Sequence, residues 1–260
     1  MSLQPEPFIR LRNVRKIYRT RGREHLAVSD VTMDVQEGEL ISLVGPSGCG
    51  KTTVLKILAG LHDADGGTIQ IGNAHTPFDP ARDIGMVFQQ PLLLKWRNVL
   101  DNVLLPAEIV GLPIKPARAR ARELLHLVGL AGYEEKYPQQ LSGGMQQRAA
   151  IARAFVHDPK LILMDEPFGA LDALTREQMN LEMLRIWRDS GKTIIFVTHS
   201  IQEAVFLASH CAVLTAGPAR MADYFPILLP FPRALPIKTT DAFGAYARRI
   251  YARLGLGAGA

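Results

Sequence analysis

The most constraining feature of this chain is the segment Gly45-Pro46-Ser47-Gly48-Cys49-Gly50-Lys51-Thr52. It fits the pattern G-x-x-x-x-G-K-[ST], follows the apolar stretch 39–44 and opens a stretch with helical periodicity. In such a strand–turn–helix unit the glycines let backbone amides face phosphate oxygens, and the helix N-terminus adds positive charge. Lys51 can reach the β- and γ-phosphates, and the Thr52 hydroxyl can ligate Mg²⁺. We therefore expect a nucleoside triphosphate site here that also includes Thr53.

Two further apolar stretches, 161–164 and 193–197, have the length of strands, and each ends in polar residues. Alternation of such strands with helical patterns predicts an α/β fold with a mostly parallel sheet. Ligands bind beyond the carboxyl ends of parallel strands, so the polar residues at these ends should converge on the glycine-rich loop. Asp165 could then hold Mg²⁺ directly or through water. Glu166 could orient or deprotonate a water that attacks the γ-phosphate.

Composition sets outer limits on function. The 260 residues suffice for one large domain or two small ones, and the formal net charge of +5 is too small to indicate nucleic-acid binding. Two cysteines, Cys49 and Cys211, argue against a disulfide framework or a cysteine-rich metal site. The start of the chain has no pattern of a secretory signal, and no apolar stretch is long enough to span a bilayer. We expect any membrane role to depend on a partner.

The segment from about 92 to 154 is helical in pattern, which predicts a helical subdomain inserted into the sheet domain. Within it, Ser142-Gly143-Gly144 begins a helix-competent stretch. This could be a second anion-binding helix start or a plain N-cap, and the residues alone favour neither. The final stretch, 241–254, has one apolar helical face and predicts a helix docked on the body of the protein.

Together, these motifs resemble those of the ATP-binding cassette (ABC) ATPases, the motor subunits of ABC transporters. Residues 141–147 resemble the family's signature motif, 45–52 its Walker A motif and 161–166 its Walker B motif. The resemblance covers about residues 8–235 and implies a P-loop NTPase (RecA-like) core. It also implies an N-terminal antiparallel β subdomain and the inserted helical subdomain at about 92–154. A C-terminal helical tail, 236–260, follows.

The resemblance implies roles for single residues. Gln89 matches the Q-loop glutamine, which senses Mg²⁺ and the attacking water. Asp172 matches the acidic residue of the D-loop, 169–172. His199 matches the switch histidine that contacts the γ-phosphate, and Tyr18 the aromatic residue that stacks on adenine. In this family the signature of one subunit closes over the ATP of another. With ATP and Mg²⁺ as cofactors, the expected catalytic residues are Glu166, His199, Gln89 and Lys51, the metal ligands Thr52, Gln89 and Asp165, and the signature contacts Ser142, Gly143, Gly144 and Gln146.

Within the family, residues 165–176 and 96–103 are similar to the nitrate/sulfonate/taurine importer group. Lys95 and the segment 209–211 depart from that group's usual pattern. Membership implies a homodimer on the cytoplasmic side of the inner membrane, bound to integral membrane permease subunits. It also implies a periplasmic or lipid-anchored solute-binding protein and no nucleic-acid partner. The apolar cluster 91–96 could be core, or by resemblance the surface that receives the permease.

Other nucleotide-binding classes fit less well. A small-molecule kinase would not require a motif such as that at residues 141–147. A guanine-nucleotide switch would need the motif N-K-x-D to bind the base, whereas no Asn in this sequence is followed by Lys. An exporter motor remains open. A non-transport cassette acting on DNA or ribosomes also remains, although such proteins usually carry two cassettes, a long coiled coil or a zinc module.

Overall fold

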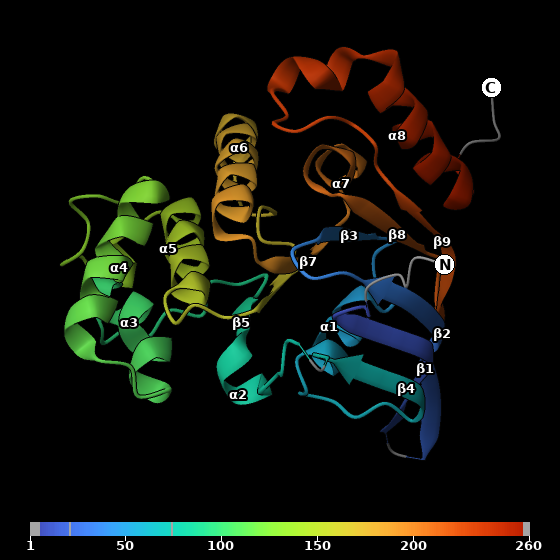
Figure 1. Ribbon diagram of the computed structural model, residues 1–260, viewed down its shortest axis with the longest axis horizontal. Helices are drawn as coiled ribbons and strands as arrows, with labels where there is room; N and C mark the ends of the chain where they lie inside the picture. The colour runs from blue at the N-terminus through green and yellow to red at the C-terminus, as the bar shows by residue number, and fades with distance from the viewer. Residues whose placement is uncertain (1–5, 21, 74, 257–260) are drawn as a thin grey trace.

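The computed structural model describes residues 6–20, 22–73 and 75–256 (Figure 1). Within these residues the chain forms one nine-stranded sheet with the strand order β4-β1-β2-β9-β8-β3-β7-β6-β5. The strands are β1 (Ile9–Thr20), β2 (Arg23–Val35), β3 (Leu40–Val44), β4 (Gly66–Ile71), β5 (Ile84–Val87), β6 (Leu161–Asp165), β7 (Thr193–Thr198), β8 (His210–Leu214) and β9 (Ala219–Pro226). The helices are α1 (Lys51–Leu58), α2 (Pro80–Asp83), α3 (Val99–Ile109), α4 (Ile114–Leu127), α5 (Gly143–Phe155), α6 (Ala173–Ser190), α7 (Ile201–Leu207) and α8 (Asp241–Arg253), with short 3₁₀ turns η1 (Pro138–Gln140) and η2 (Leu235–Thr239).

One half of the sheet is parallel. β3 pairs in parallel with β7 and β8, and β6 pairs in parallel with β5 and β7. Every residue of β3, β6 and β7 is buried, which explains why these strands are continuous apolar runs without polar alternation. The register sets Val44 opposite Thr198 and Asp165 opposite Val197, so the carboxyl ends of β3, β7 and β6 lie at one edge.

The other half of the sheet is largely antiparallel. β1 pairs antiparallel with both β2 and β4, and β9 joins the halves by pairing in parallel with β2 and antiparallel with β8. The predicted fold class is therefore confirmed: a mostly parallel core with an N-terminal antiparallel unit.

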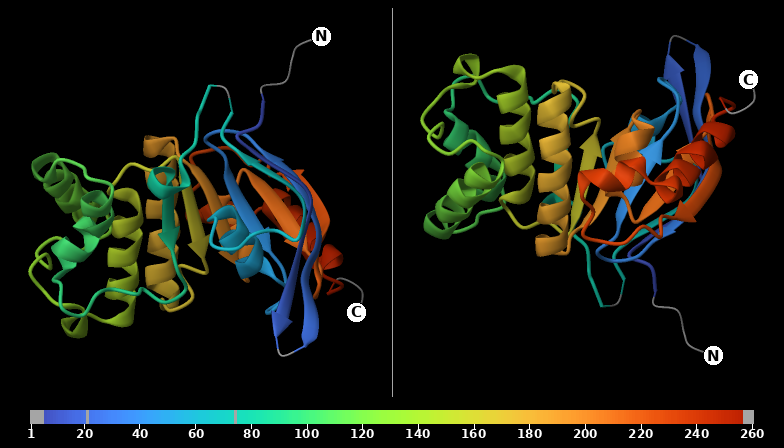
Figure 2. Two further views of the ribbon diagram at one scale, coloured as in Figure 1. Left: turned by 90° about the horizontal axis from the view of Figure 1, so that it is seen from below. Right: turned by 90° about the horizontal axis from the view of Figure 1, so that it is seen from above.

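Alternate residues of the central strands enter two hydrophobic cores. Leu40 and Val44 face the side covered by the helices of the second half of the chain, whereas Ile41 and Leu43 face α1 and the antiparallel strands. Figure 1 shows α6, α7 and α8 on one side of the sheet and α1 on the other. α3, α4 and α5 pack together, with α5 against the edge strand β5. Figure 2 shows α3 and α4 at one end of the molecule and the β1–β2 hairpin at the other.

The C-terminal helix α8 is docked on the body, as its periodicity predicted. Phe243, Ala247 and Ile250 are buried in the same core as α7. On its polar side Arg249 and Arg253 both bind the Asp223 carboxylate of β9, at 2.9 Å from each Nε to Oδ2. In the described part of the chain, no helix has both the length and the apolar character to cross a bilayer.

Candidate active site

The glycine-rich loop runs from the end of β3 to the start of α1. Gly50 is the N-cap of α1 and has φ of 112°, a left-handed conformation open to glycine. A Cβ at Gly50 would lie 2.7 Å from the Ala27 carbonyl oxygen, so the close approach of β2 also requires glycine here. Cys49 inside the loop is 1% exposed, and burial raises the pKa of its thiol. A buried, protonated thiol acts as a small packing group.

Lys51 is folded back over this loop. Its Nζ donates hydrogen bonds to the carbonyl oxygens of Gly45 at 2.8 Å and Pro46 at 3.0 Å, and the residue is 5% exposed. Backbone carbonyls thus hold the ammonium inside the loop.

Thr52 and Asp165 are joined across the edge of the sheet. The Thr52 hydroxyl lies 2.9 Å and 3.1 Å from the two Asp165 carboxylate oxygens. Asp165 is 7% exposed, and burial raises its pKa, with the hydrogen bond from Thr52 acting in the opposite direction. A hydroxyl and a carboxylate are hard oxygen ligands of the kind Mg²⁺ takes, and a cation would relieve the cost of burying this carboxylate. The residues present therefore fit a magnesium ion.

Glu166 and His199, from the ends of β6 and β7, are in contact. Glu166 has φ of 46°, and its amide donates to the Val197 carbonyl at 3.0 Å. This turn directs the carboxylate toward His199, whose Nδ1 lies 3.0 Å from Glu166 Oε2. The His199 side chain is 57% exposed and that of Glu166 is 19% exposed. The pair therefore has one face open to a substrate or a water.

A cavity of about 610 Å³ opens beside these groups. Its walls come from the loop residues 45–47, from residues 199–202, from Arg176, and from Tyr251, Leu254 and Leu256 at the end of α8. The glycine-rich loop and His199 thus share one solvent-accessible space, and the C-terminal helix borders it.

Tyr18 reaches the same region from β1. Its hydroxyl lies 3.4 Å from Thr53 Oγ1, in the first turn of α1, and its ring makes an edge contact with His62 at 5.6 Å between centroids. An aromatic ring is therefore placed next to the helix that begins at the phosphate loop, where a nucleobase could stack.

Gln89 lies just beyond β5 and is exposed. Its neighbours are held by two buried side chains of α5: Gln147, the last residue of the signature segment, for which no such contact was expected, and Arg153, which the sequence did not single out. Gln147 donates to the Phe88 carbonyl at 3.1 Å. Arg153 donates to the carbonyls of Pro91 at 2.7 Å and Leu92 at 2.9 Å. The only sequence signal for these anchors is a polar residue on the buried face of a helix.

The signature segment is set apart from the loop of its own chain. Ser142 is the N-cap of α5 and accepts a hydrogen bond from the Met145 amide at 3.2 Å, while Gln146 donates to the Pro138 carbonyl. Figure 1 shows α5 beyond the β5 edge, away from α1. Gly143 and Gly144 form the first turn of α5, and a Cβ at Gly143 would meet open space. Their predicted role requires nucleotide from another molecule.

Asp172 caps a different helix. It is the N-cap of α6 and accepts from the Thr175 amide at 3.0 Å and from the Thr175 hydroxyl. These hydrogen bonds lower the pKa of its carboxyl. The structure thus brings together Tyr18, the loop, Asp165, Glu166 and His199 and sets the signature apart from them.

Comparisons with known proteins agree with this geometry. The family model described as ABC transporter matches residues 28–169. The chain is 43% identical over 242 residues to the uncharacterized ABC transporter ATP-binding protein MJ0412 of Methanocaldococcus jannaschii, covering 93% of this chain and 89% of that protein. It is 47% identical over 197 residues to the taurine import ATP-binding protein TauB of Yersinia pestis, covering 76% of this chain and 77% of TauB.

Solved structures give the same result. The dimeric post-hydrolysis state of the ATP-binding cassette MJ0796, bound to ADP and Pi, matches with a TM-score of 0.76 and 32% identity. The match covers 85% of this chain and 100% of that one.

Proposed function

Because this chain belongs to the ABC transporter family of ATPases, we propose that it is the ATP-hydrolysing subunit of an importer for a small solute. The observation that carries this proposal is the convergence of two residue pairs at the carboxyl ends of neighbouring strands. The Thr52–Asp165 pair can hold a magnesium ion, and the Glu166–His199 pair can act on the γ-phosphate and its attacking water. The similarity to taurine import proteins supports import and a solute of the nitrate, sulfonate or taurine class.

The proposed mechanism uses groups already in position. Lys51 exchanges the Gly45 and Pro46 carbonyls for β- and γ-phosphate oxygens. Thr52, Asp165 and Gln89 would hold Mg²⁺, which when bound neutralises charge on the β- and γ-phosphates. Glu166 accepts a proton from the attacking water, and His199 donates a hydrogen bond to the γ-phosphate. Tyr18 stacks on the adenine.

We propose that two copies complete the site. Ser142, Gly143, Gly144 and Gln146 lie too far around the molecule to serve the phosphate loop of their own chain, but they begin a helix whose amides suit an anion. A head-to-tail homodimer would set each signature against the nucleotide of its partner. The dimeric cassette of MJ0796 with ADP and Pi supports this arrangement.

We also propose a permease-docking surface near Trp96. Trp96 is 74% exposed and Leu92 is 54% exposed, whereas Leu93 packs against the core, so the cluster 91–96 is core in part and exposed in part. Beside it lies a groove of about 340 Å³ lined in part by Phe88, Leu92 and Ile109. In this proposal a helix from an integral membrane permease subunit binds in the groove. This contact holds the protein at the cytoplasmic side of the inner membrane. A periplasmic or lipid-anchored protein would deliver the solute.

The same proposal divides the chain into an ABC domain at 8–235, with its helical subdomain at about 92–154, and a C-terminal helical tail at 236–260. In that division the helical subdomain presents both the signature and most of the permease groove.

The Glu166→Gln variant tests the proposed function. It should bind ATP, form a stable dimer in its presence, and lose about 10²–10⁴-fold in turnover, the usual contribution of a general base. Glu177→Gln is the matched control, since Glu177 is a half-buried carboxylate of α6 that pairs with Lys238 and does not line the site, and this variant should hydrolyse ATP normally. Turnover of Glu166→Gln at the parental rate would show that the catalytic assignment is wrong.

A further inference from the structure

Two charged side chains, Arg176 and Glu203, meet between α6 and α7 beside the active-site cavity, whose wall includes Arg176. Arg176 donates from Nη2 to the Leu171 carbonyl, just before Asp172, at 2.9 Å. Its Nε lies 3.7 Å from Oε1 of Glu203, whose side chain is only 7% exposed. Arg176 therefore bridges the segment 169–172 and the helix that follows His199.

Glu203 in turn fixes the backbone around His199. Its Oε2 accepts a hydrogen bond from the Thr198 hydroxyl, and that hydroxyl accepts one from the Ser200 amide at 2.9 Å. The residues on both sides of His199 are thus tied to the Glu203 carboxylate. A shift of Glu203 would move the peptide units that orient the His199 ring.

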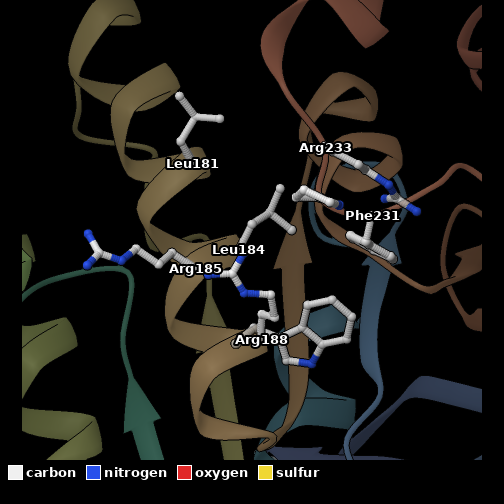
Figure 3. A pocket seen from close by; sticks show the side chains of 8 residues that line it. Leu181, Leu184, Arg185, Arg188, Phe231 and Arg233 are labelled. Carbon is white, nitrogen blue, oxygen red and sulfur yellow. The ribbon is translucent and has the colours of Figure 1, made fainter.

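The C-terminal end of α7 is also fixed in place by hydrogen bonds. Arg233, 4% exposed, donates from Nη1 to the carbonyls of Val205, Phe206 and Ala208 at 2.9–3.0 Å. Figure 3 shows the segment with Phe231 and Arg233 opposite α6, and these residues help to line a cavity of about 180 Å³ between them, with the Arg233 guanidinium directed away from α6. Because α7 is fixed at its C-terminal end, displacement of Glu203 must be taken up mainly at its N-terminal end, near His199.

An ion pair in this place is costly for packing alone. Burial raises the pKa of Glu203, whereas the Arg176 side chain is 34% exposed, and an ion pair of this kind often stabilises little. In the described residues Arg176 Nε has no hydrogen-bond partner, and its 3.7 Å separation from Glu203 leaves room for the contact to close. The pair is therefore suited to two arrangements, one looser and one tighter.

We propose that Arg176 and Glu203 form a positioning pair that couples the Asp172 segment to His199. Movement of residues 169–172 pulls on Arg176 through the Leu171 carbonyl. The Arg176–Glu203 contact then tightens and Glu203 sets the orientation of His199 through Thr198. Glu203 does not line the active-site cavity, whereas Arg176 forms part of its wall, so ATP affinity is measured beside kcat. The inference rests on the proposed role of His199 at the γ-phosphate.

The test measures steady-state ATPase and ATP affinity of Arg176→Ala, Glu203→Gln and the double variant. Each single variant should lose about tenfold to a hundredfold in kcat, the cost of a misplaced catalytic group, with ATP affinity changed by less than about threefold. The double variant should be no slower than the slower single, because the pair acts as one unit. Arg176→Lys, which keeps the charge but offers one nitrogen, should recover part of kcat.

Glu177→Gln is the matched control, since Glu177 follows Arg176 on α6 but pairs with Lys238 of η2. It should keep kcat within about twofold. Parental kcat in Glu203→Gln, or additive losses in the double variant, would overturn the proposal. The His199→Ala variant separates the proposed role of His199 from the proposed coupling. Normal turnover of His199→Ala would refute the role of His199. Loss of turnover in His199→Ala together with parental turnover in Arg176→Ala would refute only the coupling.

Discussion

Gly50→Ala is the substitution for which the structure gives the sharpest expectation. Gly50 occupies the junction of three elements: it caps α1, and a Cβ there would lie 2.7 Å from the Ala27 carbonyl oxygen of β2 and 2.9 Å from the Ala219 Cβ of β9. Both neighbours are fixed, because β2 and β9 are paired at this point through Val28 and Ala219. Neither can move aside as a flexible side chain would.

The magnitude has two parts. Placing Ala at positive φ costs about 1–2 kcal/mol, of which about 0.4–1 kcal/mol is returned by the lower entropy of the unfolded chain. The clash adds about 1–3 kcal/mol, the usual cost of overpacking. Gly111→Ala is the matched control: Gly111 has φ of 74°, but a Cβ there would meet nothing within 4 Å. We expect about 1 kcal/mol for Gly111→Ala and about 2–4 kcal/mol for Gly50→Ala.

The assay combines thermal unfolding with binding of a fluorescent ATP analogue. Each kcal/mol should lower Tm by about 2–4 °C in a chain of this size. Gly50→Ala should also lose at least about tenfold in nucleotide affinity, because relief of the clash moves the amides that cradle phosphate. Gly111→Ala should bind normally. Equal Tm values for the two variants would refute the clash, and normal ATP binding by Gly50→Ala would refute its link to the loop.

Three other predictions concern the surroundings of the site. Tyr18→Ala should raise the KM for ATP by about tenfold, since base–aromatic stacking contributes about 1–3 kcal/mol, whereas Tyr18→Phe should stay near parental. Gln147→Leu should lower kcat with little change in ATP affinity, because it frees the Phe88 carbonyl beside Gln89; an unchanged kcat in steady-state assays would contradict this. Burial alone would raise the pKa of the Asp223 carboxyl, but the hydrogen bonds from Arg249 and Arg253 together have the larger effect and the pKa is lowered. The carboxylate therefore stabilises the fold fully above about pH 4, and this stabilisation is lost as pH falls through the lowered pKa. Urea unfolding should therefore show Asp223→Asn less stable than the parent at pH 7, with the difference shrinking as pH falls below about 4.

The parts of the site that the sequence predicted are those set by local pattern. Glycine spacing placed the phosphate loop, and buried strands ending in Asp165 and His199 placed the catalytic edge, because parallel strands bring their carboxyl ends together. The N-cap role of Ser142 is local as well. For this residue, however, the sequence could not choose between a cap and an anion site, and within one molecule it is a cap.

The parts that the sequence did not predict depend on long-range contacts between polar side chains and carbonyls. Arg153 binds carbonyls 61 and 62 residues away, and Gln147 binds one 59 residues away. Glu203 is buried on α7, where it lies 3.7 Å from Arg176 of another helix. Such partners have no fixed spacing, so only the folded chain reveals them.

These long-range anchors connect α5 to the segment that follows β5. Helix α5 begins at Ser142, and through Gln147 and Arg153 it grips the segment from Phe88 to Leu92. That segment carries Gln89, proposed to face the nucleotide, and Leu92, proposed to face the permease. If nucleotide bound to the partner subunit displaces the start of α5, we expect Gln89 and Leu92 to move together with it. Breaking the hydrogen bonds of the buried Gln147 and Arg153 side chains would leave these polar groups without partners, which costs free energy. Coupling between ATP and the membrane subunit would then depend on α5 moving as a rigid rod, and weakening Arg153 should uncouple transport from ATP hydrolysis before it abolishes hydrolysis.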